Sequence, residues 1–142
     1  MKRLEFYYHG SVRGQGRPRF TKGGIAYEAR EDKAFKSDLR AAYIEQVGSD
    51  GFGKEPVSVH ISIRRPLPKS RPKKVFSEHD IYKPDADNIA KAVLDALSGL
   101  AFDDDRQVVS LSVIKYRRAR YENNLDHMHV VITSVCDEEE DK

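Results

Sequence analysis

Residues 57–64 read VSVHISIR and carry the strictest alternation of apolar and polar side chains in the chain. Neighbouring side chains of a β-strand point to opposite faces, so this pattern predicts a half-buried strand that lies centrally in a sheet. Similar alternation predicts strands over residues 4–9, 107–116 and 127–135. The last two strands are expected to form a hairpin with a long tip.

Two amphipathic helices are expected beside these strands. Apolar residues recur at helical spacing between residues 28 and 47, and Gly48 suits the left-handed position that ends a helix. A second helix is predicted over residues 85–97. Residues 10–24 are rich in glycine and predict a loop with a short strand around residues 19–21. Residues 65–83 contain three prolines and predict an extended or mobile arm. The fold class is therefore α/β (α+β), with a small mixed β-sheet packed with two main helices.

The chain has 142 residues, of which 39% are hydrophobic and 34% charged, which suits one globular domain. We expect this domain to cover residues 1–136 and the acidic tail 137–142 to be disordered. Cys136 is the only cysteine, which excludes an intrachain disulfide and a cysteine zinc site. Neither a transmembrane segment nor a signal peptide is recognisable, so a cytoplasmic protein is expected.

Charge is unevenly distributed along the chain. The net charge is +2, but the last six residues contribute −4, which leaves +6 on the other 136. Three basic clusters, in residues 13–22, 64–74 and 115–120, contain no acidic residue. Such clusters predict an anionic partner, although solvated surface loops are the simpler alternative for any one of them.

Two carboxylates, Asp85 and Asp87, stand at the start of the second predicted helix, directly after Pro84. With Asp85 in the non-helical entry and Asp87 in the first turn, both side chains can converge on a cation. The alternative is that Asp85 caps the helix and Asp87 complements the positive end of its dipole.

A second acidic element, residues 103–105, consists of three adjacent aspartates that repel one another unless a cation lies nearby. Magnesium prefers oxygen ligands and is usually held by one or two carboxylates plus a phosphate. Lys91 lies one helical turn after Asp87 and can offset charge that develops on a phosphodiester. Ordinary surface pairing of Asp87, Lys91 and Asp95 is the alternative.

Two blocks of residues together resemble the motifs of a known family. The first block is KPDADNIAK at residues 83–91 with DAL at 95–97, and the second is DDRQVV at 104–109. Their order and spacing resemble the RusA family of Holliday junction resolvases, small endodeoxyribonucleases common in phages and prophages. The resemblance covers roughly residues 1–135, and the glycine-rich segment 14–19 is similar to the phage-type members.

This resemblance implies an Mg²⁺-dependent enzyme, with Mn²⁺ as the alternative cation, that resolves four-way DNA junctions by paired symmetric nicks. It implies an intertwined homodimer with one active site per subunit, no membrane partner and no organic cofactor. By motif position, the residues implied are the metal-binding carboxylates Asp85, Asp87 and Asp105 (with Asp104 as the alternative to Asp105), the catalytic lysine Lys91 and the supporting residue Asn88. The residues then expected to contact DNA phosphates are Arg17, Arg19, Lys73, Lys74, Lys115 and Arg118.

Two other functions share parts of this pattern. A metal-dependent nuclease that acts on other branched DNA would need the same carboxylates. A non-catalytic basic DNA-binding protein would use the basic loops alone, with the carboxylates as helix caps.

Overall fold

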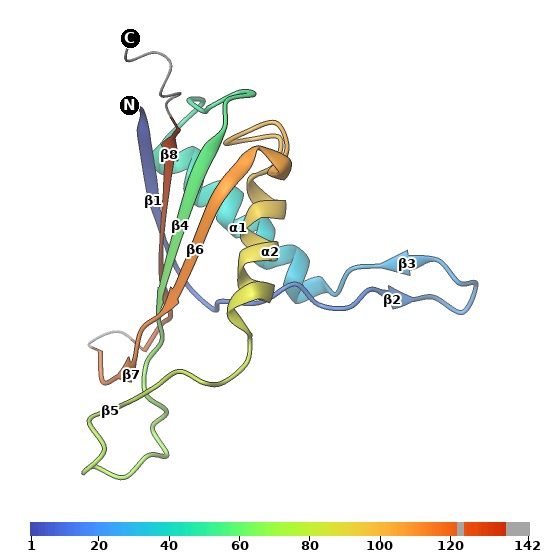
Figure 1. Ribbon diagram of the computed structural model, residues 1–142. Helices are drawn as coiled ribbons and strands as arrows, with labels where there is room; N and C mark the ends of the chain where they lie inside the picture. The colour runs from blue at the N-terminus through green and yellow to red at the C-terminus, as the bar shows by residue number, and fades with distance from the viewer. Residues whose placement is uncertain (122–123, 136–142) are drawn as a thin grey trace.

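A mixed four-stranded sheet organises the computed structural model, which describes residues 1–121 and 124–135 (Figure 1). The predicted acidic tail lies outside the described residues. The strand order is β1-β8-β4-β6, so the central position predicted for residues 57–64 is confirmed. The strands are β1 (Arg3–His9), β4 (Val57–Arg64), β6 (Val108–Lys115) and β8 (His127–Ser134).

The predicted hairpin of the last third of the chain is wrong. Strand β8 lies between β1 and β4 and is antiparallel to both, whereas β6 pairs with the other edge of β4 in parallel. The apolar side chains of β4, including Ile61 and Ile63, are fully buried, and the strand has a hydrogen-bonded neighbour on each side. Burial of β4 thus takes precedence over the pairing of strands close in sequence.

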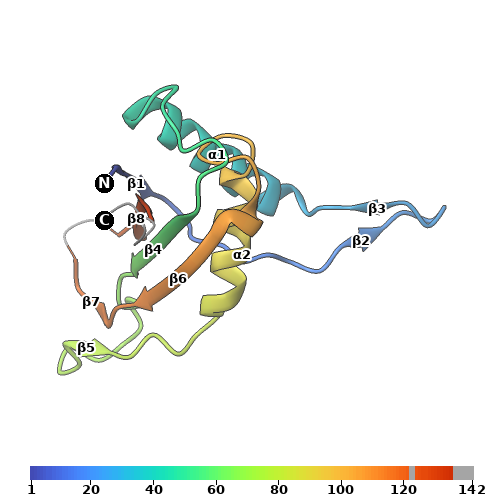
Figure 2. The same cartoon turned by 45° about the horizontal axis from the view of Figure 1, so that its top comes forward.

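The helices α1 (Arg30–Gln46) and α2 (Ala86–Leu97) confirm both helix predictions and cover one face of the sheet (Figures 1 and 2). Leu39 and Tyr43 of α1 and Ile89 and Val93 of α2 are fully buried against it. Neither helix is long and apolar enough to cross a membrane, and no other helix of the described residues is. The opposite face of the sheet carries no helix of the described chain.

Two short ribbons extend from this core. Strands β2 (Arg19–Phe20) and β3 (Ala26–Tyr27) form an arm that projects away from the body (Figures 1 and 2). Strands β5 (Ser77–Glu78) and β7 (Arg118–Ala119) pair below the sheet. The segment 65–83, predicted as an extended or mobile arm, is extended but tied to the fold through β5.

Candidate functional site

The start of α2 presents two carboxylates to solvent. Asp85 is the N-cap residue of α2, but its side chain accepts no capping hydrogen bond, and Asp87 lies in the first turn. Both residues are exposed. The capping alternative is therefore not realised for Asp85, and its carboxylate remains open to a ligand.

A buried group of charges positions the segment that precedes Asp85. The side chain of Asp80 is fully buried and accepts hydrogen bonds from Arg65 Nε and Nη2 at 2.7 and 2.6 Å. Lys115 Nζ lies 3.7 Å from the same carboxylate and donates to the carbonyl oxygens of Tyr82 (2.6 Å) and Pro84 (3.0 Å). These contacts hold the chain just before the N-cap of α2.

The ionisation of Asp80 follows from these partners. Burial alone would raise the pKa of the Asp80 carboxyl, but the hydrogen bonds and charge of Arg65, together with the charge of Lys115, outweigh it. The pKa of Asp80 is therefore lowered below its ordinary value, and the carboxylate is ionised at neutral pH.

A glycine-rich loop crosses the first turn of α2. The backbone nitrogen of Gln15 donates to the carbonyl oxygen of Asn88 at 2.9 Å. A Cβ at Gly14 would lie 2.9 Å from the Cβ of Asn88, and one at Gly16 would lie 2.5 Å from Oδ2 of Asp32. Only glycine at positions 14 and 16 allows so close an approach without a shift of the neighbours.

This loop and α2 enclose a cleft of about 790 Å³ that is lined by both acidic and basic side chains. Asp85 and Asn88 line it, and so does Asp32, which is buried and accepts a hydrogen bond from Arg13 Nε at 2.9 Å. No pattern in the sequence distinguishes Asp32, since an acid in a first helical turn is common. The basic residues that line the cleft are Arg13, Arg17, Arg19 and Lys83.

The third predicted carboxylate lies elsewhere. Asp105 opens the short 3₁₀ helix η1 (Asp105–Gln107), which follows the C-terminal end of α2 in the chain. Since α2 has 12 residues at 1.5 Å rise per residue, its two ends are separated by about 18 Å. Among the described residues, no group of three or more histidines, cysteines and acids could hold a metal ion. A single chain therefore does not bring Asp85, Asp87 and Asp105 together as one metal site.

The neighbouring Asp104 has a local role in this structure. Its carboxylate accepts a hydrogen bond from the backbone nitrogen of Arg106 at 3.0 Å, and its own backbone nitrogen donates to Gln107 Oε1 at 2.8 Å. The bond from Arg106 lowers the pKa of Asp104, whereas the side-chain hydrogen bond with Asp104 raises the pKa of Asp105. Asp104 thus caps η1, whereas the carboxyl group of Asp105 does not take part in the cap.

Lys91 is exposed on α2, one turn after Asp87. The alternative in which it pairs with Asp95 is not realised, because Asp95 forms an ion pair with Lys36 of α1 at 2.6 Å. Lys36 is buried and also contacts Glu28. The exposed ammonium of Lys91 is thus not committed to Asp95.

The basic residues predicted to contact DNA fall into two groups. Arg17, Arg19, Lys73 and Lys74 are exposed. Arg118 is instead buried, 3.4 Å from Glu78, with its guanidinium over the ring of Tyr82. Like Lys115, it serves the fold around residues 78–84.

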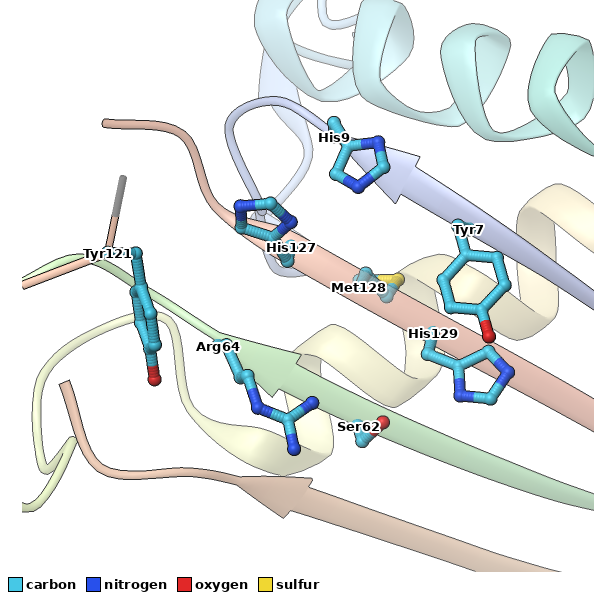
Figure 3. Close-up of a pocket in the computed structure, with 8 residues that line it drawn as sticks. All are labelled: Tyr7, His9, Ser62, Arg64, Tyr121, His127, Met128 and His129. Carbon is cyan, nitrogen blue, oxygen red and sulfur yellow. The ribbon is translucent and has the colours of Figure 1, made fainter. Parts of the chain in front are cut away.

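A second hollow, of about 550 Å³, lies on the helix-free face of the sheet (Figure 3). Its lining includes histidines and tyrosines but no acidic residue. His129 stacks on Tyr7 with ring centroids 4.3 Å apart, and its Nε2 lies within hydrogen-bonding distance, 2.8 Å, of Oε2 of Glu5. This hollow is therefore not the site that contains the predicted carboxylates.

Comparison with known proteins connects this geometry to a family. The model for the endodeoxyribonuclease RusA matches residues 9–132, which include the cleft, α2 and η1. The chain belongs to the RusA family. An uncharacterized protein of Bacillus subtilis (strain 168), YqaN, is 35% identical over 124 residues, which cover 80% of this chain and 87% of that protein. Membership of the RusA family identifies a nuclease that hydrolyses phosphodiester bonds in DNA.

Asp80→Asn tests the buried charges below the site. We expect it to lower the free energy of unfolding by about 3 to 5 kcal/mol at pH 7, because Arg65 and Lys115 lose a buried anion. The lowered pKa means that the contribution of Asp80 is present above the unfolded value near pH 4 and is lost as the pH falls through the folded value. Denaturant unfolding of both proteins from pH 7 to pH 3 should show the difference shrink. Asp50→Asn, at an exposed ion pair with Lys2, is the matched control and should cost much less.

Proposed function

We propose that this RusA-family nuclease resolves four-way DNA junctions by paired symmetric nicks. The main support is one observation: Asp85 and Asn88, from the family motif, line a cleft that is otherwise rich in arginine. A basic cleft with an uncommitted carboxylate suits a phosphodiester held beside a cation.

The residues at the start of α2 fit a divalent cation in part. Asp85 and Asp87 are exposed, and Asp85 is free of the helix cap, so the two can act as the one or two protein carboxylates that Mg²⁺ usually takes beside a substrate phosphate. Asp105 does not join them within one chain. We propose Mg²⁺ as the cofactor, with Mn²⁺ as the alternative, and Asp85 and Asp87 as its ligands. Asp105, which can join them only across the proposed dimer, is the proposed third catalytic carboxylate.

The chain's own groups then have distinct roles in hydrolysis. A bound divalent cation supplies polarisation of the phosphoryl oxygen and a lower pKa for a water nucleophile. Lys91, exposed one turn after Asp87, offsets negative charge that develops on the phosphate. Asn88 is half-buried under the glycine-rich loop and orients Asp85 or a water molecule.

Contacts to DNA phosphates are proposed for the exposed residues Arg17, Arg19, Lys73 and Lys74. Such contacts make affinity fall steeply with salt, and the shape of the junction then provides most of the selectivity. Lys115 and Arg118 support this surface from within the fold. The DNA substrate places the reaction in the cytoplasm of a bacterium or a phage-infected host.

A homodimer is proposed because β6 is an edge strand with an unusual number of exposed apolar side chains. Val109, Leu111 and Ile114 are 62%, 45% and 40% exposed. An apolar edge strand with free hydrogen-bonding groups is a site for pairing with another chain. A two-fold dimer would present two active sites to a two-fold junction, which matches paired nicks.

The proposed activity is tested by cleavage of a labelled four-way junction beside a matched linear duplex, with Mg²⁺ and with chelator. We expect paired symmetric nicks in the junction alone, and their loss both with chelator and in Asp87→Asn. Equal cutting of the duplex would contradict junction selectivity. Cutting of another branched DNA would favour the first alternative, and tight binding without cutting in Mg²⁺ or Mn²⁺ would favour a DNA-binding protein.

Substitutions in the second acidic element test which carboxylate takes part in hydrolysis. Asp105→Asn should slow junction cleavage at least about 100-fold, the scale expected when one group is removed from a catalytic site. Asp104→Asn retains an oxygen that can cap η1 and should change the rate less than about 10-fold. Single-turnover rates would measure both, and a larger loss in Asp104→Asn would reverse the assignment.

The proposed dimer is tested at the edge strand. Leu111→Lys places a charge among the exposed apolar side chains of β6. It should shift the protein to monomers in sedimentation, since edge lysines oppose strand pairing. Ile44→Lys is the matched control, because Ile44 is 54% exposed on α1 and lies away from β6. A monomeric wild-type protein, or equal effects of both substitutions, would contradict this interface.

A further inference from the structure

The projecting arm has no role in the fold described above. Strands β2 and β3 pair only with each other, with Arg19 opposite Tyr27 and Phe20 opposite Ala26. Both views show the ribbon extending away from the sheet and helices (Figures 1 and 2). Its side chains therefore face solvent rather than the core.

Three large apolar side chains of the arm are exposed. Phe20 is 65% exposed, Ile25 is 69% and Tyr27 is 48%. A narrow ribbon that holds three such residues away from the core gains no burial from them. Clustered exposed apolar side chains on a soluble protein commonly mark a binding surface.

The charge of the arm selects the kind of partner. Residues 13–27 contain three arginines and one lysine but no acidic residue. A cationic ribbon with exposed aromatic rings matches a polyanion that also offers flat apolar faces. Nucleic-acid bases offer such faces, and stacking of bases on aromatic side chains is worth about 1 to 3 kcal/mol per base.

The arm also begins at the candidate active site. Gly16, Arg17 and Arg19 line the same cleft as Asp85. Phe20 follows Gly16 by four residues, so an extended chain places it about 13 Å further along, or roughly four nucleotides at 3.4 Å each. A base near the cleavage position is therefore within reach of Phe20.

We propose that the arm enters the branch point of the DNA and that Phe20 stacks on a base left without its neighbour there. This inference rests on the proposed function and adds a residue that recognises the branch. Bases within a linear duplex are already stacked on both faces and cannot accept Phe20 without unstacking. The arm then distinguishes branched from linear DNA, while its basic residues bind any phosphate backbone.

The test compares binding of a four-way junction and a matched duplex by three variants, each made in the Asp87→Asn protein so that the DNA stays intact. Phe20→Ala should weaken junction binding roughly 5- to 150-fold, the equivalent of about 1 to 3 kcal/mol, and duplex binding less than about twofold. Phe20→Trp keeps an aromatic face and should stay within about twofold of the parent. Lys22→Ala, the control for a phosphate contact, should weaken both DNAs equally and reduce the salt slope by about one.

Each other outcome counts against the arm in a distinct way. Equal weakening of junction and duplex by Phe20→Ala would make Phe20 a general DNA contact, and no change would remove it from DNA binding. A change of sedimentation mass in Phe20→Ala would assign the arm to a second copy of the chain instead. If the Asp87→Asn parent itself shows no preference for the junction, the proposed function and this inference both fall. Because Phe20 is exposed, misfolding of these variants is not expected.

Discussion

The ion group of Arg65, Asp80 and Lys115 is the interaction on which the geometry of the site depends. Arg65 directly follows β4 and Lys115 ends β6, so both cations stand where the parallel strand pair ends. Asp80 is fully buried between them, and each cation also binds carbonyl oxygens of the segment that leads into α2. The sheet therefore determines where α2 begins, and with it the position of Asp85. A buried carboxylate without those partners would be strongly unfavourable, so the three groups stabilise one arrangement.

Around this anchor, the cleft is assembled from parts of the chain that lie far apart in sequence. The loop at residues 14–16 contacts the first turn of α2, and Asp32 of α1 closes the cleft through its ion pair with Arg13. The same loop continues into the exposed arm of β2 and β3 (Figure 1). The close contact of Gly14 with the first turn of α2 thus connects the start of α2 to the projecting arm. In this layout the arm extends from the same loop that contacts the start of α2, next to Asp85.

The basic residues divide between fold and surface, and this division bears on how DNA would bind. Lys115 lies beside the buried Asp80 and Arg118 beside the half-buried Glu78, so substitution of either would act first on stability. The exposed arginines and lysines of the loops do not neutralise a buried acid, and they can replace bound water with a DNA phosphate without unfolding the chain. The exposed apolar residues divide similarly, because those of β6 suit a second protein chain whereas those of the arm stand among positive charges. The two proposals above therefore concern different partners for the two surfaces.

Features that depend on neighbouring residues could be predicted before the structure was known. Alternation in residues 57–64 and helical spacing in residues 85–97 identified β4 and α2, and the motif around Asp85 identified the family, because periodicity and motif spacing are local properties. The insertion of β8 beside β4, the presence of Asp32 in the cleft, the burial of Lys115 and the separation of Asp105 from Asp85 became visible in the folded chain alone. Strand partners and the burial of charges follow from long-range packing, in which distant segments compete for the same core. A local pattern carries no information about the outcome of that competition.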